Sequence, residues 1–208
     1  SEGLDVLGYL IEMLSGLPLD RFFTERIFDP LGMEDTYFYL PDSKKERLVA
    51  VQTWEDGTWV NYPSTPFYDP DYPVKGAKSF FSGGGGLSST AKDYANFLQM
   101  YLNLGELNGV RLLSRTTVQL IMSNQVGDLL GESGSYHGLA FGVIDERGEA
   151  MGGKGNAGTF EWGGYFNTSY FADPEEQVIG IIMKQTQEIP ADETGWKFRQ
   201  LVGQAIDN

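Results

Sequence analysis

Residues 158–186 read GTFEWGGYFNTSYFADPEEQVIGIIMKQT, and this stretch decides the fold class. Its aromatic and β-branched residues predict strands, two of them separated by a turn at Asp173-Pro174-Glu175-Glu176. The run Val178–Met183 is apolar on both faces, which predicts a central strand covered on both sides. The predicted strands are 138–146, 158–167, 168–173 and 177–186. Together they predict an antiparallel meander.

Helical spacing of apolar residues is found on both sides of this meander. The predicted helical faces run through Leu4–Leu14, Leu19–Ile27, Tyr94–Leu102, Val118–Met122 and Phe198–Ile206. Residues 34–82 are rich in aromatic residues and predict a long loop with short hairpins, one of them around Glu55-Asp56-Gly57. This order predicts an α+β domain, with a helical and loop-rich region at 1–135 and an antiparallel sheet with a C-terminal helix at 136–208.

The bulk composition excludes several classes of function. The chain has 208 residues, of which 41% are hydrophobic, enough to bury a sizeable core. Its 15 Lys and Arg against 29 Asp and Glu give a net charge of −14, which repels nucleic acid and anionic lipid surfaces. Without Cys there is no disulfide, thiolate nucleophile or Cys-ligated zinc. No apolar run approaches the roughly 20 residues of a membrane span, and the sequence does not fix the cellular compartment.

The single histidine and the longest glycine run carry no recognised motif. His137 is the only histidine, and no G-x-S-x-G segment supplies the serine of a Ser-His-Asp triad. In its Gly- and Ser-rich surroundings, His137 is interpreted as an exposed loop residue. The run Gly83–Gly86 lacks the spacing of a phosphate-binding loop and is interpreted as a flexible or tightly packed turn. A single histidine also excludes the His-rich zinc sites, and neither a metal nor a cofactor is expected.

Ser89-Thr90-Ala91-Lys92 has the S-x-x-K spacing of a serine that is activated by a lysine one helical turn later. Thr90 and Asp93 have the spacing of a capping box, so Ser89 falls outside the helix and Lys92 becomes its second residue. The apolar stripe of this helix points Lys92 towards water, where a lysine stays protonated near pH 7. We interpret Ser89 and Lys92 as a coincidental match, with a true dyad in a shortened enzyme as the alternative.

Several short motifs occur in a fixed order along nearly the whole chain. They are Ile11–Gly16 (IEMLSG), Ile27–Met33 (IFDPLGM), Asp35-Thr36, Gly84–Thr90 (GGGLSST), Asp93-Tyr94, Gly109–Ser114 (GVRLLS), Phe160–Gly164 (FEWGG), Asp173-Pro174 and Gln185. This order resembles the serine β-lactamase-like superfamily, which includes penicillin-binding-protein-like enzymes. The closest resemblance is to class C β-lactamase-like carboxylesterases, the family VIII esterases. It implies an antiparallel sheet flanked by helices and joined to a helical region, of which this chain is the C-terminal portion and therefore an incomplete fold.

The resemblance also implies where the active-site residues lie. The family's nucleophilic Ser and its Lys come from an S-x-x-K motif N-terminal to everything in this chain, and the assisting Tyr aligns just before Ser1. The third family motif, K-T-G or H-x-G, aligns with Trp162-Gly163-Gly164, which implies substrate-binding residues. The backbone N–H of Tyr165 then matches an oxyanion-hole donor. From the residues alone, Trp162-Gly163-Gly164 also fits a bulged strand with a core tryptophan.

One main hypothesis and two alternatives follow. The main hypothesis is the C-terminal part of a serine acyl hydrolase, carboxylesterase-like, which acts on a small-molecule ester or amide through an acyl-enzyme and is inactive without the missing segment. The first alternative is a β-lactamase or D-alanyl peptidase. The absence of a cation at Trp162 to hold a substrate carboxylate favours neutral esters over it. The second is a non-catalytic binding or assembly module, whose open sheet edge pairs with the missing N-terminal part or with another copy.

Overall fold

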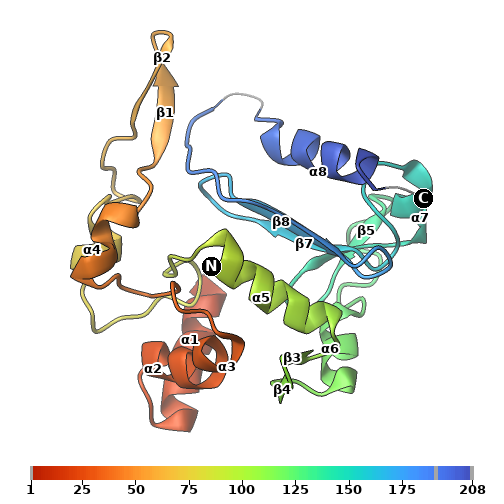
Figure 1. The fold of residues 1–208 in the computed structure, drawn as a ribbon, viewed down its shortest axis with the longest axis horizontal. Coiled ribbons are helices and arrows are strands. Elements are labelled where there is room, and N and C mark those ends of the chain that lie inside the picture. The colour runs from red at the N-terminus through yellow and green to blue at the C-terminus, as the bar shows by residue number, and fades with distance from the viewer. Residues whose placement is uncertain (1, 190–191, 207–208) are drawn as a thin grey trace. The chain divides into compact units, whose positions relative to one another are not determined.

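The computed structural model describes residues 2–189 and 192–206, and the chain forms two compact units, Ser1–Asn96 and Phe97–Asn208 (Figure 1). The boundary between these units falls inside a helix, whereas the sequence pattern predicts a change of region at residue 136. In the described ranges, no helix combines the length and the apolar composition that crossing a bilayer requires.

The first unit begins with a group of helices, as the apolar spacing predicts. These are α1 (Glu2–Ser15), α2 (Leu19–Phe23), a π-helical turn (Thr24–Phe28) and α3 (Asp29–Leu31). Gly32 ends the series in a left-handed conformation with φ of 66°, and the N–H of Met33 bonds to the carbonyl of Phe28 at 2.9 Å. Only glycine takes this conformation without a steric cost, so the Leu31-Gly32-Met33 motif is a helix stop.

The predicted loop of residues 34–82 contains the expected hairpin. A 3-10 helix (Asp42–Arg47) is followed by β1 (Gln52–Glu55), β2 (Thr58–Asn61) and the short α4 (Tyr72–Lys75). The turn residues Asp56 and Gly57 both have positive φ, 46° and 83°, which is the conformation of a tight hairpin turn. The glycine run is a tightly packed turn, because a Cβ added at Gly83 would lie 2.4 Å from the carbonyl oxygen of Leu4.

The second unit contains the predicted antiparallel sheet. Before it come the end of α5 (Ala91–Leu102), the small hairpin β3 (Glu106–Leu107) and β4 (Val110–Arg111), and α6 (Arg115–Met122). The sheet consists of β5 (Ser135–His137), β6 (Gly142–Ile144), β7 (Phe160–Gly163), β8 (Ser169–Asp173) and β9 (Val178–Ile182), in that spatial order. All neighbouring pairs are antiparallel, and the chain closes with α8 (Thr194–Gln204). The predicted α+β fold is confirmed.

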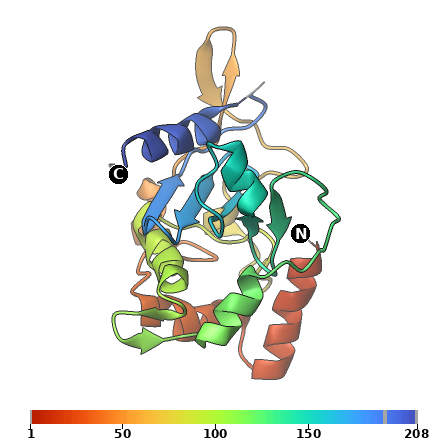
Figure 2. The ribbon, with the colours of Figure 1, turned by 90° about the vertical axis from the view of Figure 1, so that its right-hand side faces the viewer.

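Helices cover both faces of this sheet. On one face, Tyr101 from the end of α5 packs edge-on against Phe141 at 5.1 Å between ring centres, and Phe160 lies beside both. On the other face lies α8, whose Phe198 contacts Phe171 of β8 (Figures 1 and 2). The core of the unit includes Leu98, Met100, Val118, Val143, Ile144, Phe160 and Ala172.

Three sequence-based expectations about this unit are wrong. β9 pairs only with β8 among the described residues, so it lies at one end of the sheet instead of its centre. An apolar run indicates that both faces of a strand are covered, but it does not indicate whether both edges are paired. This explains why the position of β9 in the sheet was predicted wrongly. The predicted strand 138–146 is shorter, and an unexpected helix, α7 (Glu146–Met151), follows it with Asp145 as its N-cap. His137 belongs to β5 rather than to an exposed loop.

Candidate active site

The segment Trp162-Gly163-Gly164-Tyr165 forms a sheet rim that is open on one side. On the β8 side, β7 is paired along its whole length, with Gly163 opposite Ser169. On the β6 side, pairing stops at Glu161, which lies opposite Gly142. Within the described residues, β7 therefore extends beyond its neighbour from Trp162 onwards. We call Trp162–Tyr165 the β7 rim.

The direction of the backbone groups along the rim follows from the bonds of Gly164. Its N–H donates to the carbonyl of Thr168 at 2.9 Å, and its carbonyl accepts from the N–H of Asn167 at 3.0 Å. Backbone polar groups point to alternate sides along an antiparallel strand, so those of Gly163 point away from β8. Tyr165 lies in the turn after β7, and its N–H points opposite to the Gly164 carbonyl across their trans peptide bond, hence away from Asn167. No hydrogen-bond acceptor for the Tyr165 N–H is found in the described part of the chain. The rim thus presents a free backbone donor.

Glycine is required at the rim for a local reason. A Cβ added at Gly164 would lie 2.2 Å from the hydroxyl oxygen of Thr168, and one at Gly163 would lie 3.2 Å from the Thr168 carbonyl oxygen. The turn that returns the chain from β7 to β8 therefore packs directly against both glycines. A side chain at Gly164 would force either the Thr168 hydroxyl or the rim to move, and a shift of the rim would change the direction of the Tyr165 N–H.

A groove of about 350 Å³ lies beside the rim. Its lining residues come from one compact unit and are Leu130, Ser135, Tyr136, His137, Gly142, Glu161, Trp162, Gly163 and Ser169. The Trp162 side chain is 51% exposed, which excludes a core tryptophan. Trp162 and Gly163 are thus brought together in the groove, whereas Gly164 and Tyr165 do not line it. Tyr136 and His137 were not predicted as site residues, since their strand was placed too late in the sequence.

The electrostatic character of the groove is close to neutral. Glu161 is its only carboxylate, and Arg199 of α8 pairs with it and also donates to the carbonyl of Lys154. Neither Lys nor Arg is found among the lining residues. Burial raises the pKa of Tyr136, and the nearby Asp145 carboxylate adds to this effect, so its phenol stays protonated. The groove therefore offers hydroxyls, one ring nitrogen and apolar surface, without a cation for a substrate carboxylate.

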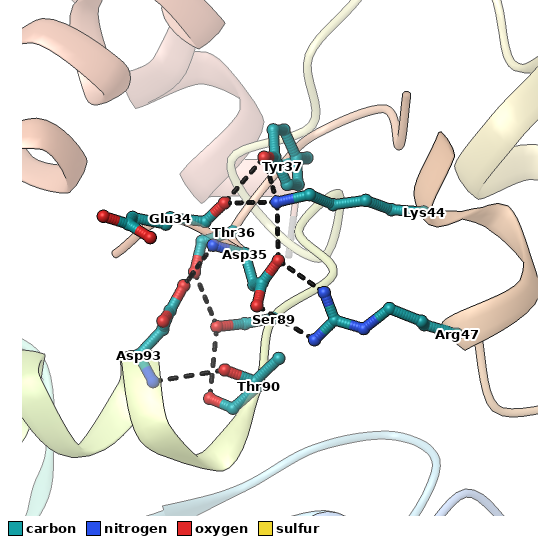
Figure 3. Close-up of polar contacts among 9 residues, drawn as sticks. All are labelled: Glu34, Asp35, Thr36, Tyr37, Lys44, Arg47, Ser89, Thr90 and Asp93. Carbon is teal, nitrogen blue, oxygen red and sulfur yellow. Dashed lines mark hydrogen bonds and ion pairs between the residues drawn. The ribbon is translucent and has the colours of Figure 1, made fainter. Parts of the chain in front are cut away.

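The Ser89 hydroxyl belongs to a structural network (Figure 3). Thr36 donates its hydroxyl proton to the Asp93 carboxylate at 2.9 Å, so Ser89 is the donor in the 2.7 Å contact between its Oγ and that of Thr36. Lys92 is exposed, and no contact between Ser89 and Lys92 is found among the described residues. Thr90 caps α5 by accepting the N–H of Asp93 at 3.2 Å. In a capping box the Asp93 carboxylate would accept from the N–H of Thr90. Here it accepts instead from the N–H of Asp35 and from the Thr36 hydroxyl.

Asp35 ties the same network to the 3-10 helix. Arg47 forms two hydrogen bonds to its carboxylate at 2.7 and 2.9 Å, and Lys44 adds a third at 2.6 Å (Figure 3). The bonds from Arg47 and then Lys44 hold the pKa of Asp35 far below its ordinary value. Residues that carried the family resemblance, Asp35, Thr36 and Asp93, thus hold loops together. The spacing in the sequence gave no sign of this contact, since Asp93 lies more than 50 residues from Asp35 and Thr36.

A second groove, of about 590 Å³, lies in the first unit. It is lined mainly by α1, α2 and the residues between them, together with Lys78, Ser79 and Phe81. None of the residues predicted to act on substrate lines this groove.

Comparison with known proteins identifies the family. A sequence model of the Beta-lactamase family matches residues 2–204, and the chain belongs to this family. A protein of Mycobacterium tuberculosis H37Rv, Rv1367c, is 31% identical over 198 residues, which cover 89% of this chain and 48% of that protein. An Escherichia coli K12 protein, provisionally named as a D-alanyl-D-alanine carboxypeptidase, is 31% identical over 133 residues, 59% of this chain and 30% of its own length.

The fold comparison agrees with this assignment. The structure of EstCE1, described as a hydrolase with promiscuous acyltransferase activity, superimposes with a TM-score of 0.76 at 24% identity. The match covers 95% of this chain and 53% of that one. The chain spans about half the length of the curated relatives that match it along most of its own length. The predicted β-lactamase-like fold and family membership are therefore confirmed.

Proposed function

We propose that this chain supplies the oxyanion and substrate-binding half of a serine acyl hydrolase that acts on neutral carboxylic esters. The observation that carries the proposal is the open β7 rim, with its unpaired Tyr165 N–H beside a groove that lacks cations. Membership of the β-lactamase family supports a serine-based acyl transfer. The nucleophilic Ser, with its activating Lys and Tyr, comes from polypeptide outside these 208 residues.

The chemistry assigned to the rim is electrostatic. The external serine oxygen attacks the ester carbonyl carbon, its proton passes to the external base, and the carbonyl oxygen becomes an oxyanion. The Tyr165 N–H donates to this oxyanion, together with the N–H of the serine itself, and each such donor contributes roughly 3–4 kcal/mol in favourable cases. Collapse expels the alcohol and leaves an acyl-serine, and attack by water at the same carbon then releases the acid.

The lining of the groove favours neutral esters over β-lactams and D-alanyl peptides. Both alternative substrates carry a carboxylate, and a cation at the position of Trp162 would pair with it. Here an uncharged indole fills that position, and Arg199, which contacts the groove residue Glu161, is 9% exposed and already paired with it. The name of the E. coli relative favours the D-alanyl peptidase alternative. Hydrolysis rates measured in parallel with a chromogenic ester and a chromogenic cephalosporin decide between an esterase and this alternative class.

Labelling with a fluorophosphonate tests the proposal. The isolated chain, its Ser89→Ala variant, and the chain joined to the polypeptide that precedes it in its gene are treated in parallel. We expect label only on the joined protein, at a serine outside residues 1–208. Label on the isolated chain that disappears in Ser89→Ala would instead establish Ser89 and Lys92 as the dyad.

A second candidate function, an assembly module, is favoured by β9. This strand is apolar, lies at one end of the sheet and presents one unpaired edge among the described residues. A second copy or the N-terminal part of the fold would continue the sheet there. Light scattering across a concentration series tests self-association: dimers or larger species support it, and a monomer that melts cooperatively at every concentration contradicts it.

A further inference from the structure

The only histidine of the chain has a fixed position in the groove beside the β7 rim. His137 ends β5 and is partly buried, and its ring packs edge-on against Trp162 with 4.9 Å between ring centres. Both residues line the groove. The indole therefore restrains one side of the imidazole. A histidine in an exposed loop would have no such contact.

The hydrogen bond of the ring defines which nitrogen carries the proton. His137 Nδ1 lies 2.7 Å from the carbonyl oxygen of Gly138. A carbonyl oxygen can only accept, so Nδ1 is the donor, and Nε2 of the neutral ring is an acceptor. Within residues 2–189 and 192–206, Nε2 has no hydrogen-bond partner. The groove thus contains a ring nitrogen, Nε2, whose position is fixed by the Nδ1 hydrogen bond and the indole contact and which can accept a hydrogen bond from a ligand.

The other lining residues limit what this acceptor can meet. Leu130 and Trp162 are 45% and 51% exposed and offer apolar surface, whereas Ser135 and Ser169 offer hydroxyls. The Glu161 carboxylate is held by Arg199. A ligand that satisfies this set is neutral, has an apolar part against Trp162 and carries a hydroxyl or amide N–H that donates to His137.

We propose that His137 is a specificity-determining residue, which selects neutral substrates with a hydrogen-bond donor on the acyl group. This inference rests on the proposed esterase function, because the groove adjoins the rim that would hold the reacting carbonyl. Trp162 acts as the positioning residue, since it restrains the ring that offers Nε2.

Two esters that differ by one hydroxyl test the inference in the joined, full-length protein. p-Nitrophenyl 3-hydroxybutanoate and p-nitrophenyl butanoate are compared by kcat/KM. We expect the protein to prefer the hydroxylated ester by about three- to tenfold, the usual range for one net hydrogen bond. His137→Phe keeps a ring against Trp162 but removes Nε2, so it should abolish the preference by lowering kcat/KM for the hydroxylated ester more than for the butanoate ester. His137→Gln, which keeps an acceptor, should restore part of it. A preference that survives in His137→Phe, or an equal loss for both esters, would overturn the inference.

A readout without catalysis separates this inference from the esterase proposal. Since the chain has one histidine, the two imidazole ¹⁵N signals are assigned without ambiguity. In the 208-residue chain, the Nε2 signal should shift on addition of methyl 3-hydroxybutanoate and stay in place with methyl butanoate. If neither chromogenic ester is hydrolysed but this shift occurs, the proposed function fails, whereas recognition of a hydroxyl-bearing ligand by His137 Nε2 stands. If Nε2 carries the proton, or responds to both probes or to neither, the role of His137 is refuted.

Discussion

At the scale of single residues, the rim depends on Gly164. Its missing side chain leaves room for the Thr168 hydroxyl, 2.2 Å from where a Cβ would be, and its two backbone bonds set the direction of the next N–H. Gly164→Ala should destabilise the chain by about 1–3 kcal/mol through overpacking. In the joined protein it should lower kcat at least tenfold, because a small displacement of the donor is costly for catalysis.

The double variant Gly164→Ala/Thr168→Ala is the matched control for this effect. Removal of the Thr168 hydroxyl leaves its Cβ 3.6 Å from the new methyl group, an ordinary contact distance. We therefore expect urea denaturation to show most of the stability restored, and kcat to recover with it. A double variant as damaged as Gly164→Ala would show that the glycine serves another purpose.

At the scale of elements, α8 is anchored to the rim strand by a partly buried charge pair, in which the Arg199 side chain is 10% and the Glu161 side chain 36% exposed. Arg199 pairs with Glu161 of β7, and its guanidinium also lies 5.1 Å from the centre of the Phe171 ring. Arg199→Met should cost about 1–2 kcal/mol, because it removes the partner of Glu161, whose side chain is 36% exposed and keeps part of its hydration. Chemical denaturation of Arg199→Met/Glu161→Gln should recover part of this loss. A double variant less stable than Arg199→Met would contradict the explanation.

The start of α8 provides a dependence of stability on pH. Burial by itself would raise the pKa of Asp192, but hydrogen bonds from Lys184 and Thr194 outweigh it and lower the pKa to about 2. A depressed carboxyl pKa stabilises the fold above the ordinary value of 3.8, and this contribution is lost as the pH falls towards 2. Asp192→Asn should therefore reduce the free energy of unfolding by about 2 kcal/mol at pH 7 and by about half of that at pH 3.

Urea denaturation at pH 7 and pH 3 measures this difference. The neighbouring Glu193 is exposed and pairs with Lys197 one turn later. Its replacement by Gln serves as the control, and we expect no resolvable change in stability. An Asp192→Asn effect of the same size at both pH values would show that the charge is not its cause.

The elements also show how far the sequence alone could predict the molecule. Helical periodicity located α1, α5 and α8, and the Asp173-Pro174 turn placed β8 and β9, because these signals are local. The position of β9 in the sheet was missed, since edge pairing depends on which chain lies beside it. His137 was misread because its contact with Trp162 joins residues 25 apart in a sheet. The network of Asp35, Thr36 and Asp93 is non-local in the same way.

At the scale of the whole molecule, the chain matches about half the length of its relatives, and in its described part open strand edges lie at the β7 rim and at β9. The net charge of −14 keeps polyanions away from this surface, which fits a small neutral substrate. The rim offers a backbone donor and the groove offers a binding surface, but the only S-x-x-K serine, Ser89, is engaged with Thr36. The proposed acyl transfer therefore needs an attacking group from another stretch of polypeptide.

Acylation by a chromogenic ester, followed by intact-mass and peptide mass spectrometry, tests this requirement most directly. The 208-residue chain should release no burst of chromophore and gain no acyl group. The same chain joined to the polypeptide that precedes it in its gene should show a burst and carry one acyl group on a serine outside residues 1–208. An acyl group on a serine within the isolated chain, or a joined protein that is never acylated, would contradict the account.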